Sequence, residues 1–199
     1  MRRRRRPIGV VLAGGSGRRI GGSKAIVRLK GQPLITYPLG ALRAVLHDVM
    51  IVAKADTELP SLPGITVWIE PSTPRHPIVG ITHALALADR RPVLIAAADM
   101  PFLTPGVVEW LASADPGRSP AVIATHGGRL HPLLGCYQPQ AAVPLAAALA
   151  AGDVALTDAV LALGPRLIEI EDEETLFNIN APEDLLQAAA VLDGRISRR

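Results

Sequence analysis

The chain has 199 residues, 49% of them hydrophobic and 20% charged, so it can bury the core of one domain and is not disordered as a whole. Its one cysteine, Cys136, excludes an internal disulfide and a zinc site built from cysteines, and it suits a reducing, cytoplasmic setting. The sequence has no run of about 18 apolar residues, so we expect no membrane-spanning helix. The net charge of +3 depends on the five arginines Arg2–Arg6, without which it would be −2. We therefore expect a disordered basic extension over residues 1–7, and no nucleic-acid-binding surface.

From Ile8 onward, short apolar runs alternate with helical patterns, which is typical of βαβ units and a mainly parallel sheet. The predicted strands are Ile8–Ala13, Val49–Ala53, Ile65–Ile69, Pro92–Ala97, Ala121–Thr125 and, at a half-exposed edge, Arg166–Ile170. The predicted helices are Leu34–Leu46, Val79–Ala88, Thr104–Ala114, Gln138–Ala151 and a last one that ends near Leu192. We expect one α/β domain over residues 8–192, a Rossmann-like three-layer sandwich, with a tail over residues 193–199.

Three features concern the predicted helix boundaries. Pro38 should kink the first helix or shift its start, because proline lacks an N–H and clashes inside a helix. Thr104 followed by Pro105 is a favourable helix start, an N-cap and then proline at the first helical position. The last helix is predicted to open with Asn180 as its N-cap and Glu183 three residues later.

A glycine-rich segment follows the first predicted strand and runs from Leu12 to Lys24. It holds five glycines in the nine residues 14–22, together with the cations Arg18, Arg19 and Lys24. Glycines let several backbone N–H groups point at one ligand, and the cations add positive charge, so the segment predicts a triphosphate site.

Two common phosphate-binding patterns do not fit this segment. The Walker pattern needs a Ser or Thr after its lysine, whereas Ala25 follows Lys24. The dinucleotide pattern that would begin at Gly15 places Ile20 where a third glycine is required. The loop is therefore of another nucleotide-binding type.

Asp99 follows the buried strand Pro92–Ala97, at the edge where open α/β sheets bind their ligands. Mg²⁺ favours one or two carboxylates together with phosphate oxygens and water, so Asp99 is a candidate ligand for a Mg²⁺ ion that bridges phosphates. The alternative is that Asp99 only caps a turn before Pro101.

The loop resembles the signature L-A-G-G-x-S-x-R-M-G-x-D-K of the molybdenum cofactor guanylyltransferases, the MobA-like family of nucleotidyltransferases. Gly17, Ile20 and Ser23 depart from it, and Ser23 replaces an aspartate that helps to orient the lysine in the family. The matching residues are Leu12, Ala13, Gly14, Gly15, Arg19, Gly21 and Lys24. The resemblance extends over about residues 8–186.

Other segments carry the same resemblance. Asp99–Leu103 is similar to the family's D-x-P-F/Y-L/I motif, whose aspartate binds magnesium, and 178–185 resembles N-x-N-T-P-E-[DE]-L with Ala181 in place of Thr. His131-Pro132 matches a segment on the acceptor side of the family's cleft. Residues 70–80 correspond to the family's base- and ribose-reading loop, in which Pro71 replaces an aspartate and Gly80 is retained.

The resemblance implies a set of site residues. Arg19, Lys24 and Asp99 would be catalytic, with Asp99 as the metal ligand. His131 is equally explained as a turn histidine, and Asn180 as a helix cap. The residues implied in binding nucleotide or acceptor are Leu12, Ala13, Gly14, Gly15, Ser16, Gly17, Lys24, Gly80, His131, Asn178 and Asn180.

The implied reaction transfers GMP from GTP, with Mg²⁺, to the phosphate of molybdopterin in its molybdenum form. Its products would be molybdopterin guanine dinucleotide and pyrophosphate. The implied partners are GTP, molybdopterin and proteins that deliver molybdopterin or mature molybdoenzymes, without nucleic acid or membrane.

Other interpretations stay open. A cytidylyltransferase relative usually has Ala-Ala-Gly in place of Ala13-Gly14-Gly15, and adenosylcobinamide-phosphate guanylyltransferases lack an equivalent of Asp99–Leu103. A nucleotide-binding regulatory or scaffold protein that has lost catalysis is the alternative outside enzymes, and it stays open because Ser23 and Pro71 depart from the family's pattern. The base preference is therefore open at this stage.

Overall fold

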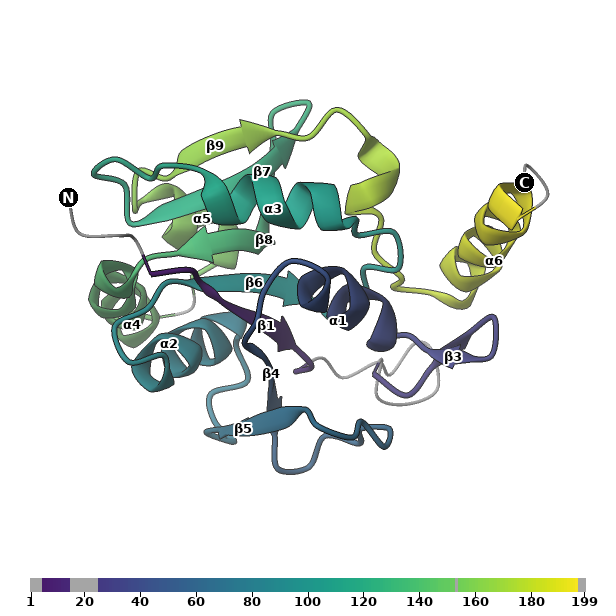
Figure 1. Cartoon of the computed structure of the whole chain (residues 1–199). Helices are drawn as coiled ribbons and strands as arrows, with labels where there is room; N and C mark the ends of the chain where they lie inside the picture. The colour runs from purple at the N-terminus through teal and green to yellow at the C-terminus, as the bar shows by residue number, and fades with distance from the viewer. Residues whose placement is uncertain (1–4, 15–24, 153, 197–199) are drawn as a thin grey trace.

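The computed structural model describes residues 5–14, 25–152 and 154–196. Its centre is a seven-stranded sheet in the order β5-β4-β1-β6-β8-β7-β9 (Figure 1). Strands β5, β4, β1 and β6 are mutually parallel, β8 is antiparallel to both of its neighbours, and β9 pairs in parallel with β7. The strands in sheet order are Thr66–Glu70, Val49–Lys54, Ile8–Leu12, Val93–Ala97, Arg129–Tyr137, Ala121–His126 and Arg166–Glu169.

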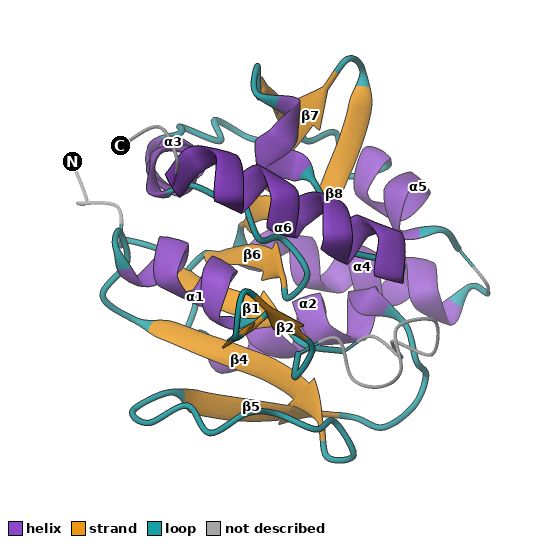
Figure 2. Ribbon diagram, turned by 90° about the vertical axis from the view of Figure 1, so that its right-hand side faces the viewer, coloured by secondary structure: helices purple, strands orange, loops and turns teal. Residues whose placement is uncertain are grey.

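Helices cover both faces of this sheet and make it the middle of three layers (Figures 1 and 2). The core is divided in two by the sheet, and neighbouring side chains of β1 lie on opposite sides of it. Val11 belongs to the core on one face and Val10 to the core on the other. Helices α1 (Thr36–Arg43) and α3 (Pro105–Ser113) share the core of Val11. Those that share the core of Val10 are α2 (Pro77–Leu87), α4 (Ala142–Ala150) and α5 (Leu156–Leu161). The single-domain three-layer α/β prediction is confirmed.

All six predicted strands are present, and β9 lies at an edge as expected. Helix α1 begins at Thr36, which shifts its start so that Pro38 falls in the first turn, where an N–H has no partner within the helix. Strand β8, helix α5 and the short hairpin of β2 (Arg28–Leu29) and β3 (Gln32–Pro33) were not expected.

Strand β8 escapes a pattern-based prediction because its sequence contains Pro132. The pairing of β7 with β8 shifts register here, from Ile123 opposite Gly135 to Ala124 opposite His131. Pro132 lies in this irregular stretch, where proline takes no ladder bond away from β7. On the other side of β8, pairing with β6 is regular.

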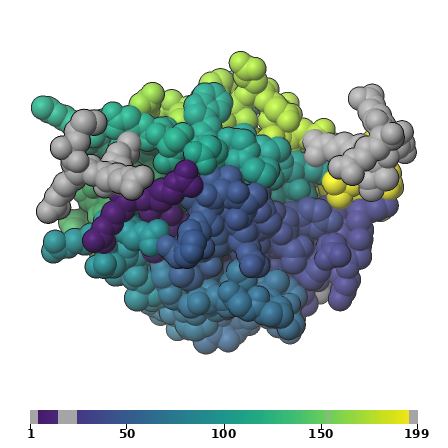
Figure 3. All heavy atoms as spheres, viewed as in Figure 1, coloured from purple at the N-terminus to yellow at the C-terminus, as the bar shows by residue number. Residues whose placement is uncertain are grey.

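A third, smaller core joins the C-terminal helix α6 (Pro182–Ile196) to the β2-β3 hairpin. Figure 3 shows α6 in yellow against this N-terminal part of the chain. The Lys30 ammonium pairs with the Asp193 carboxylate at 2.5 Å. The fully or nearly buried members of this core are Leu29, Leu34, Phe102, Ile179 and Ala188.

The predicted cap of the last helix is wrong in detail. The helix begins at Pro182, so Asp184 is its third residue, and the Asp184 carboxylate accepts hydrogen bonds from the backbone N–H groups of Asn180 and Ala181, at 2.7 and 2.9 Å. Capping therefore depends on Asp184 rather than on Asn180 and Glu183. The helix also continues to Ile196, beyond the predicted end near Leu192.

The basic N-terminal extension differs from the expectation in its last residues. The Arg91 guanidinium donates two hydrogen bonds to the carbonyl of Arg6, at 3.1 and 3.2 Å, and Arg6 donates to the carbonyl of Val45. Arg5 lies 3.4 Å from the Asp89 carboxylate. Residues 5 and 6 are thus attached to the domain, whereas residues 1–4 lie outside the described residues. Within the described ranges, every helix is too short or too polar to cross a membrane.

Candidate active site

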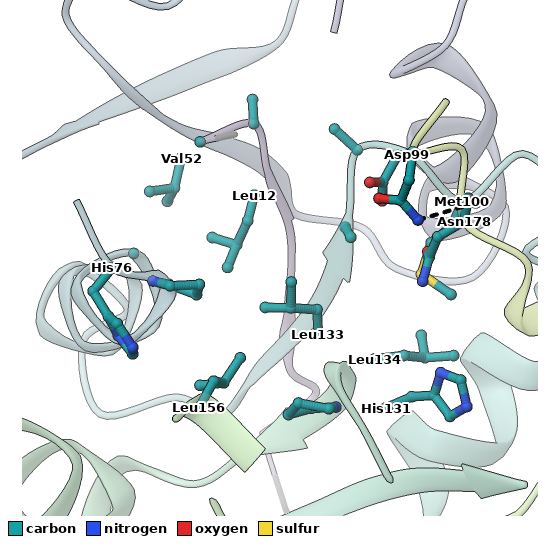
Figure 4. Close-up of a pocket in the computed structure, with 18 of the residues that line it drawn as sticks. Leu12, Val52, His76, Asp99, Met100, His131, Leu133, Leu134, Leu156 and Asn178 are labelled. Carbon is teal, nitrogen blue, oxygen red and sulfur yellow. Dashed lines mark hydrogen bonds between the residues drawn. The ribbon is translucent and has the colours of Figure 1, made fainter. Parts of the chain in front are cut away.

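The parallel strands β1, β4, β5 and β6 end along one edge of the sheet, and a cavity of about 1120 Å³ opens there. Figure 4 shows Asp99, Met100 and Asn178 together at one end of it and His76 at the opposite side, with Leu133 between them. Predicted site residues that line it are Leu12, Ala13, Gly14, Gly80, Asp99, His131, Asn178 and Asn180. Segments near residues 12, 99 and 178, far apart in the chain, are thereby brought to one cavity.

At the first end, a backbone hydrogen bond ties two predicted motifs together. The Ile179 N–H donates to the Asp99 carbonyl at 3.0 Å, which places Asn178 beside Asp99. Phe102 and Phe177 pack behind these residues, with ring centroids 5.8 Å apart. Oδ1 of Asn178 is buried and has no hydrogen-bond partner among the described residues. Asn180 is exposed, and its side-chain N–H donates to the Asn178 carbonyl at 3.4 Å.

These oxygen atoms are the kind of ligand that Mg²⁺ prefers, a carboxylate and an amide carbonyl. Among the described residues no group of three or more His, Cys, Asp or Glu could hold a metal. A Mg²⁺ ion here would therefore need phosphate oxygens or water as further ligands, which is its usual manner of binding. The donor set fits the ion that the sequence suggests.

The start of the glycine loop forms the centre of the cavity edge. The Ala13 N–H donates to the Val52 carbonyl of β4 at 2.8 Å, and the Ala98 N–H donates to the Leu12 carbonyl at 3.2 Å. These bonds fix the backbone of residues 12 and 13 between the ends of β4 and β6. The remaining predicted loop residues, Gly15, Ser16, Gly17, Arg19 and Lys24, lie outside the described residues.

His131 lines the cavity from strand β8. Burial lowers the pKa of its imidazole, and electrostatic repulsion from Arg129 and from the nearby His126 lowers it further. The ring is therefore neutral at pH 7 and can donate or accept a hydrogen bond without adding charge.

Strands β4 and β5 contribute a buried ion pair that the sequence analysis did not single out. Nζ of Lys54 lies 3.3 Å from Oε1 of Glu70 and donates to the Pro71 carbonyl at 2.6 Å. The two side chains are only 6% exposed. A signal was available, since each residue directly follows a predicted apolar strand and so stands at the same edge as Asp99.

The remaining wall joins the N-terminus of α2 to α5. Nδ1 of His76 accepts a hydrogen bond from the Ile78 N–H, and its Nε2–H donates to the Val154 carbonyl at 2.9 Å. At the exposed rim, Arg75 pairs with Asp56, and this hydrogen bond holds the pKa of the Asp56 carboxyl below its usual value. Polar contacts therefore connect the segment before α2 with residues near 56 and near 154.

Three comparisons relate the chain to known proteins. The family model of the MobA-like NTP transferase domain matches residues 9–165. A molybdenum cofactor guanylyltransferase of Cereibacter sphaeroides is 34% identical over 194 residues, which cover 94% of this chain and 97% of that protein. A probable molybdenum cofactor guanylyltransferase of Thermococcus gammatolerans is 33% identical and covers 89% of this chain and 96% of its own. The solved structure of molybdopterin-guanine dinucleotide biosynthesis protein A from Archaeoglobus fulgidus has a TM-score of 0.77 and 28% identity, covering 94% and 98% of the two chains.

Proposed function

The chain belongs to the MobA-like NTP transferase family, and from this premise we propose that it transfers GMP from GTP to the phosphate group of molybdopterin. The acceptor would carry molybdenum, and the products would be molybdopterin guanine dinucleotide and pyrophosphate. Membership makes the chain a nucleotidyltransferase. The choice of GTP, of Mg²⁺ and of this acceptor is the proposal, and the names of the similar proteins support it.

The observation that carries the proposal is that Asp99 and Asn178 lie beside each other. They line the same cavity as Leu12 and Gly14, with which the glycine loop starts. A triphosphate that binds along the glycine loop would extend toward these oxygens. When bound there, Mg²⁺ would neutralise phosphate charge and orient the α-phosphate. Asp99 would hold it by its carboxylate and Asn178 by the buried Oδ1.

In the proposed step, an oxygen of the acceptor phosphate forms a bond to the α-phosphorus of GTP. The bond from that phosphorus to the bridging oxygen breaks, and pyrophosphate leaves with the electron pair. The acceptor phosphate is ionised at neutral pH, so the step needs positioning and charge neutralisation more than a general base.

The side chains have separate tasks in this step. The cations Lys24 and Arg19 are proposed to bind the triphosphate and to stabilise the charge of the leaving pyrophosphate. The residues Leu12 to Gly14 and Gly80 would accept the nucleotide along the cavity edge. His131 and Asn180 would contact the acceptor, and the neutral His131 ring can donate a hydrogen bond to its phosphate.

We propose a cytoplasmic setting, which the single cysteine of the chain suits. We also propose partner proteins that deliver molybdopterin or receive the product for molybdoenzymes.

Pyrophosphate release tests the reaction directly. The full chain is mixed with Mg²⁺, the molybdenum form of molybdopterin and each of the four NTPs, and pyrophosphate and the dinucleotide product are measured. GTP is expected to be the preferred donor. Faster turnover with CTP would assign the chain to cytidylyl transfer, and GTP binding without product would show a nucleotide-binding protein without this activity.

A further inference from the structure

Helix α6 stands apart from the helices that cover the sheet (Figure 1). Among the described residues, none from α6 belongs to either of the two cores on the faces of the sheet. The α6 side chains that belong to the third core recur every three or four residues and so form one face of the helix. They are Leu185, Ala188, Ala189, Val191 and Leu192. Helix α6 can therefore detach without opening the cores of the sheet, since local opening exposes only the contacts of the segment that leaves.

The third core also contains the neighbours of the two residues proposed to bind Mg²⁺. Phe177 and Ile179 belong to this core and stand on either side of Asn178. Phe102 belongs to it as well, three residues after Asp99. The hydrogen bond from the Ile179 N–H to the Asp99 carbonyl joins the two segments. The apolar face of α6 thus shares one core with the residues that fix the backbone beside Asp99 and Asn178.

The amide of Asn178 depends on this packing. Its Oδ1 is buried and has no hydrogen-bond partner among the described residues, so no hydrogen bond within them sets the direction of that oxygen. The position of the amide comes instead from the burial of its flanking residues Phe177 and Ile179. A metal ion requires its ligands at fixed positions, and these are held by the packing of the residues around them. What holds the third core together therefore also holds the oxygen.

Both ends of α6 are fixed by a carboxylate. At its start, the Asp184 carboxylate accepts two backbone hydrogen bonds. At its far end, the Asp193 carboxylate pairs with the Lys30 ammonium of the β2-β3 hairpin. Lys30 and Gly31 have φ values of 50° and 81°, as a two-residue hairpin turn requires, so Lys30 lies at the tip of the hairpin. The two side chains of the pair are 39% and 59% exposed, so the pair contributes little to the stability of the whole chain.

We propose that α6 is a positioning element of the active site. Docked on the third core, it holds Asp99 and Asn178 where they bind Mg²⁺ together with the triphosphate, and detached, it releases them. Lys30 and Asp193 are positioning residues that hold the docked helix at its far end. Bound metal and nucleotide in turn stabilise the docked helix, because coupling between two equilibria is reciprocal. The inference rests on the proposed function only in that Asp99 and Asn178 bind Mg²⁺.

Ala188→Glu tests the docking of α6. Ala188 is 0% exposed in the third core, so a glutamate there should detach α6 and leave the sheet folded. Hydrogen exchange should become at least tenfold faster at the amides of α6 and of Ile179 and stay unchanged in β6. In calorimetry, the affinity for GTP should fall at least tenfold with Mg²⁺ and change less than twofold with EDTA. Ala190→Glu is the matched control, because Ala190 is exposed on the same helix, and it should change neither measurement.

The Lys30–Asp193 pair gives a milder test in a chain that stays folded. Lys30→Met and Asp193→Asn should each raise the Mg²⁺ concentration for half-maximal GTP binding about threefold, the effect of losing one exposed pair. The double variant Lys30→Asp, Asp193→Lys should restore the wild-type value, since it reverses the pair and aspartate tolerates a positive φ. Asp89→Asn is the control, because it removes the exposed pair with Arg5 after α2, and it should leave the Mg²⁺ requirement unchanged.

Three results overturn the inference. They are release of α6 in Ala188→Glu without loss of GTP affinity in Mg²⁺, an equal loss of affinity with Mg²⁺ and with EDTA, and a wild-type affinity that does not depend on Mg²⁺. If Ala188→Glu does not fold or keeps α6 docked, the pair variants decide, and an unchanged Mg²⁺ requirement in both refutes the inference.

None of these measurements involves the acceptor. A chain that behaves as expected in them and yet releases no pyrophosphate with molybdopterin would refute the proposed function and leave the inference standing.

Discussion

At one end of the cavity Asp99 and Asn178 are positioned by backbone and packing, through the Ile179–Asp99 hydrogen bond and the Phe102–Phe177 contact. At the other end Lys54 and Glu70 position each other through a buried ion pair. The first arrangement gathers oxygen atoms and suits an incoming cation, whereas the second already contains its cation. Substitutions at the two ends should therefore fail in different ways, one in catalysis and the other in stability.

The largest effect is expected for Asp99→Ala. Removing this carboxylate should lower turnover by about 10³-fold or more, because the metal and the α-phosphate lose their anchor. The fold should persist, since the bond from Ile179 uses the Asp99 backbone carbonyl, which alanine retains. Pyrophosphate release and thermal unfolding, measured side by side, check this. Full activity in the variant would remove Asp99 from the metal site.

Lys54→Met tests the other end. It leaves the Glu70 carboxylate buried without its cation, and breaking such a pair should reduce the free energy of unfolding by about 3 kcal/mol. The double variant Lys54→Met, Glu70→Gln should recover most of this loss, because no buried charge then remains. Denaturant unfolding measures all three chains.

The rim pair provides the control for that comparison. Arg75→Ala breaks the exposed Arg75–Asp56 pair and should leave unfolding essentially unchanged. If Lys54→Met lowers the free energy of unfolding as little as Arg75→Ala does, water reaches the Glu70 carboxylate. The buried pair would then contribute no more to stability than an exposed pair.

A smaller effect is expected for Phe102→Leu, in the third core behind Asp99. The loss of ring contacts should cost about 1 kcal/mol of stability. The same change should raise the Mg²⁺ concentration needed for half-maximal activity, because the Asp99 and Asn178 segments are less firmly joined. The loss of stability caused by Lys54→Met should be the same with and without Phe102→Leu, since the effects of independent sites add. A different loss would mean that the two ends are coupled.

The smallest effect concerns pH. Folding lowers the pKa of His131 below its usual 6.5, chiefly by burial. Below pH 6.5 the unfolded chain binds this proton more readily than the folded chain does, so stability should fall as pH decreases from 6.5 to the folded pKa. Above 6.5 the contribution is constant. His131→Gln should flatten the dependence of unfolding free energy on pH between 5 and 7; an unchanged slope would show that other groups cause it.

The sequence by itself determined six strands of the sheet and most helices, because apolar runs and 3.6-residue patterns are local properties of the chain. It also identified the Leu12–Gly14, Asp99 and Asn178 segments, since each has a motif and stands after a strand or before a helix. The roles of these residues stay predictions, and for Arg19 and Lys24 so does their placement.

Only the tertiary structure decided which residues meet. The ion pair between Lys54 and Glu70 depends on β4 lying next to β5. The sequence places each residue at the end of a predicted strand, but it does not show that these two strands are neighbours. Strand β8 was hidden by Pro132, which only the register shift beside β7 accommodates. Capping by Asp184 depends on where α6 begins, a boundary that packing of the third core decides. The difference has one physical cause: periodicity and turn chemistry act over a few residues, whereas burial, charge pairing and strand order join residues far apart in the chain.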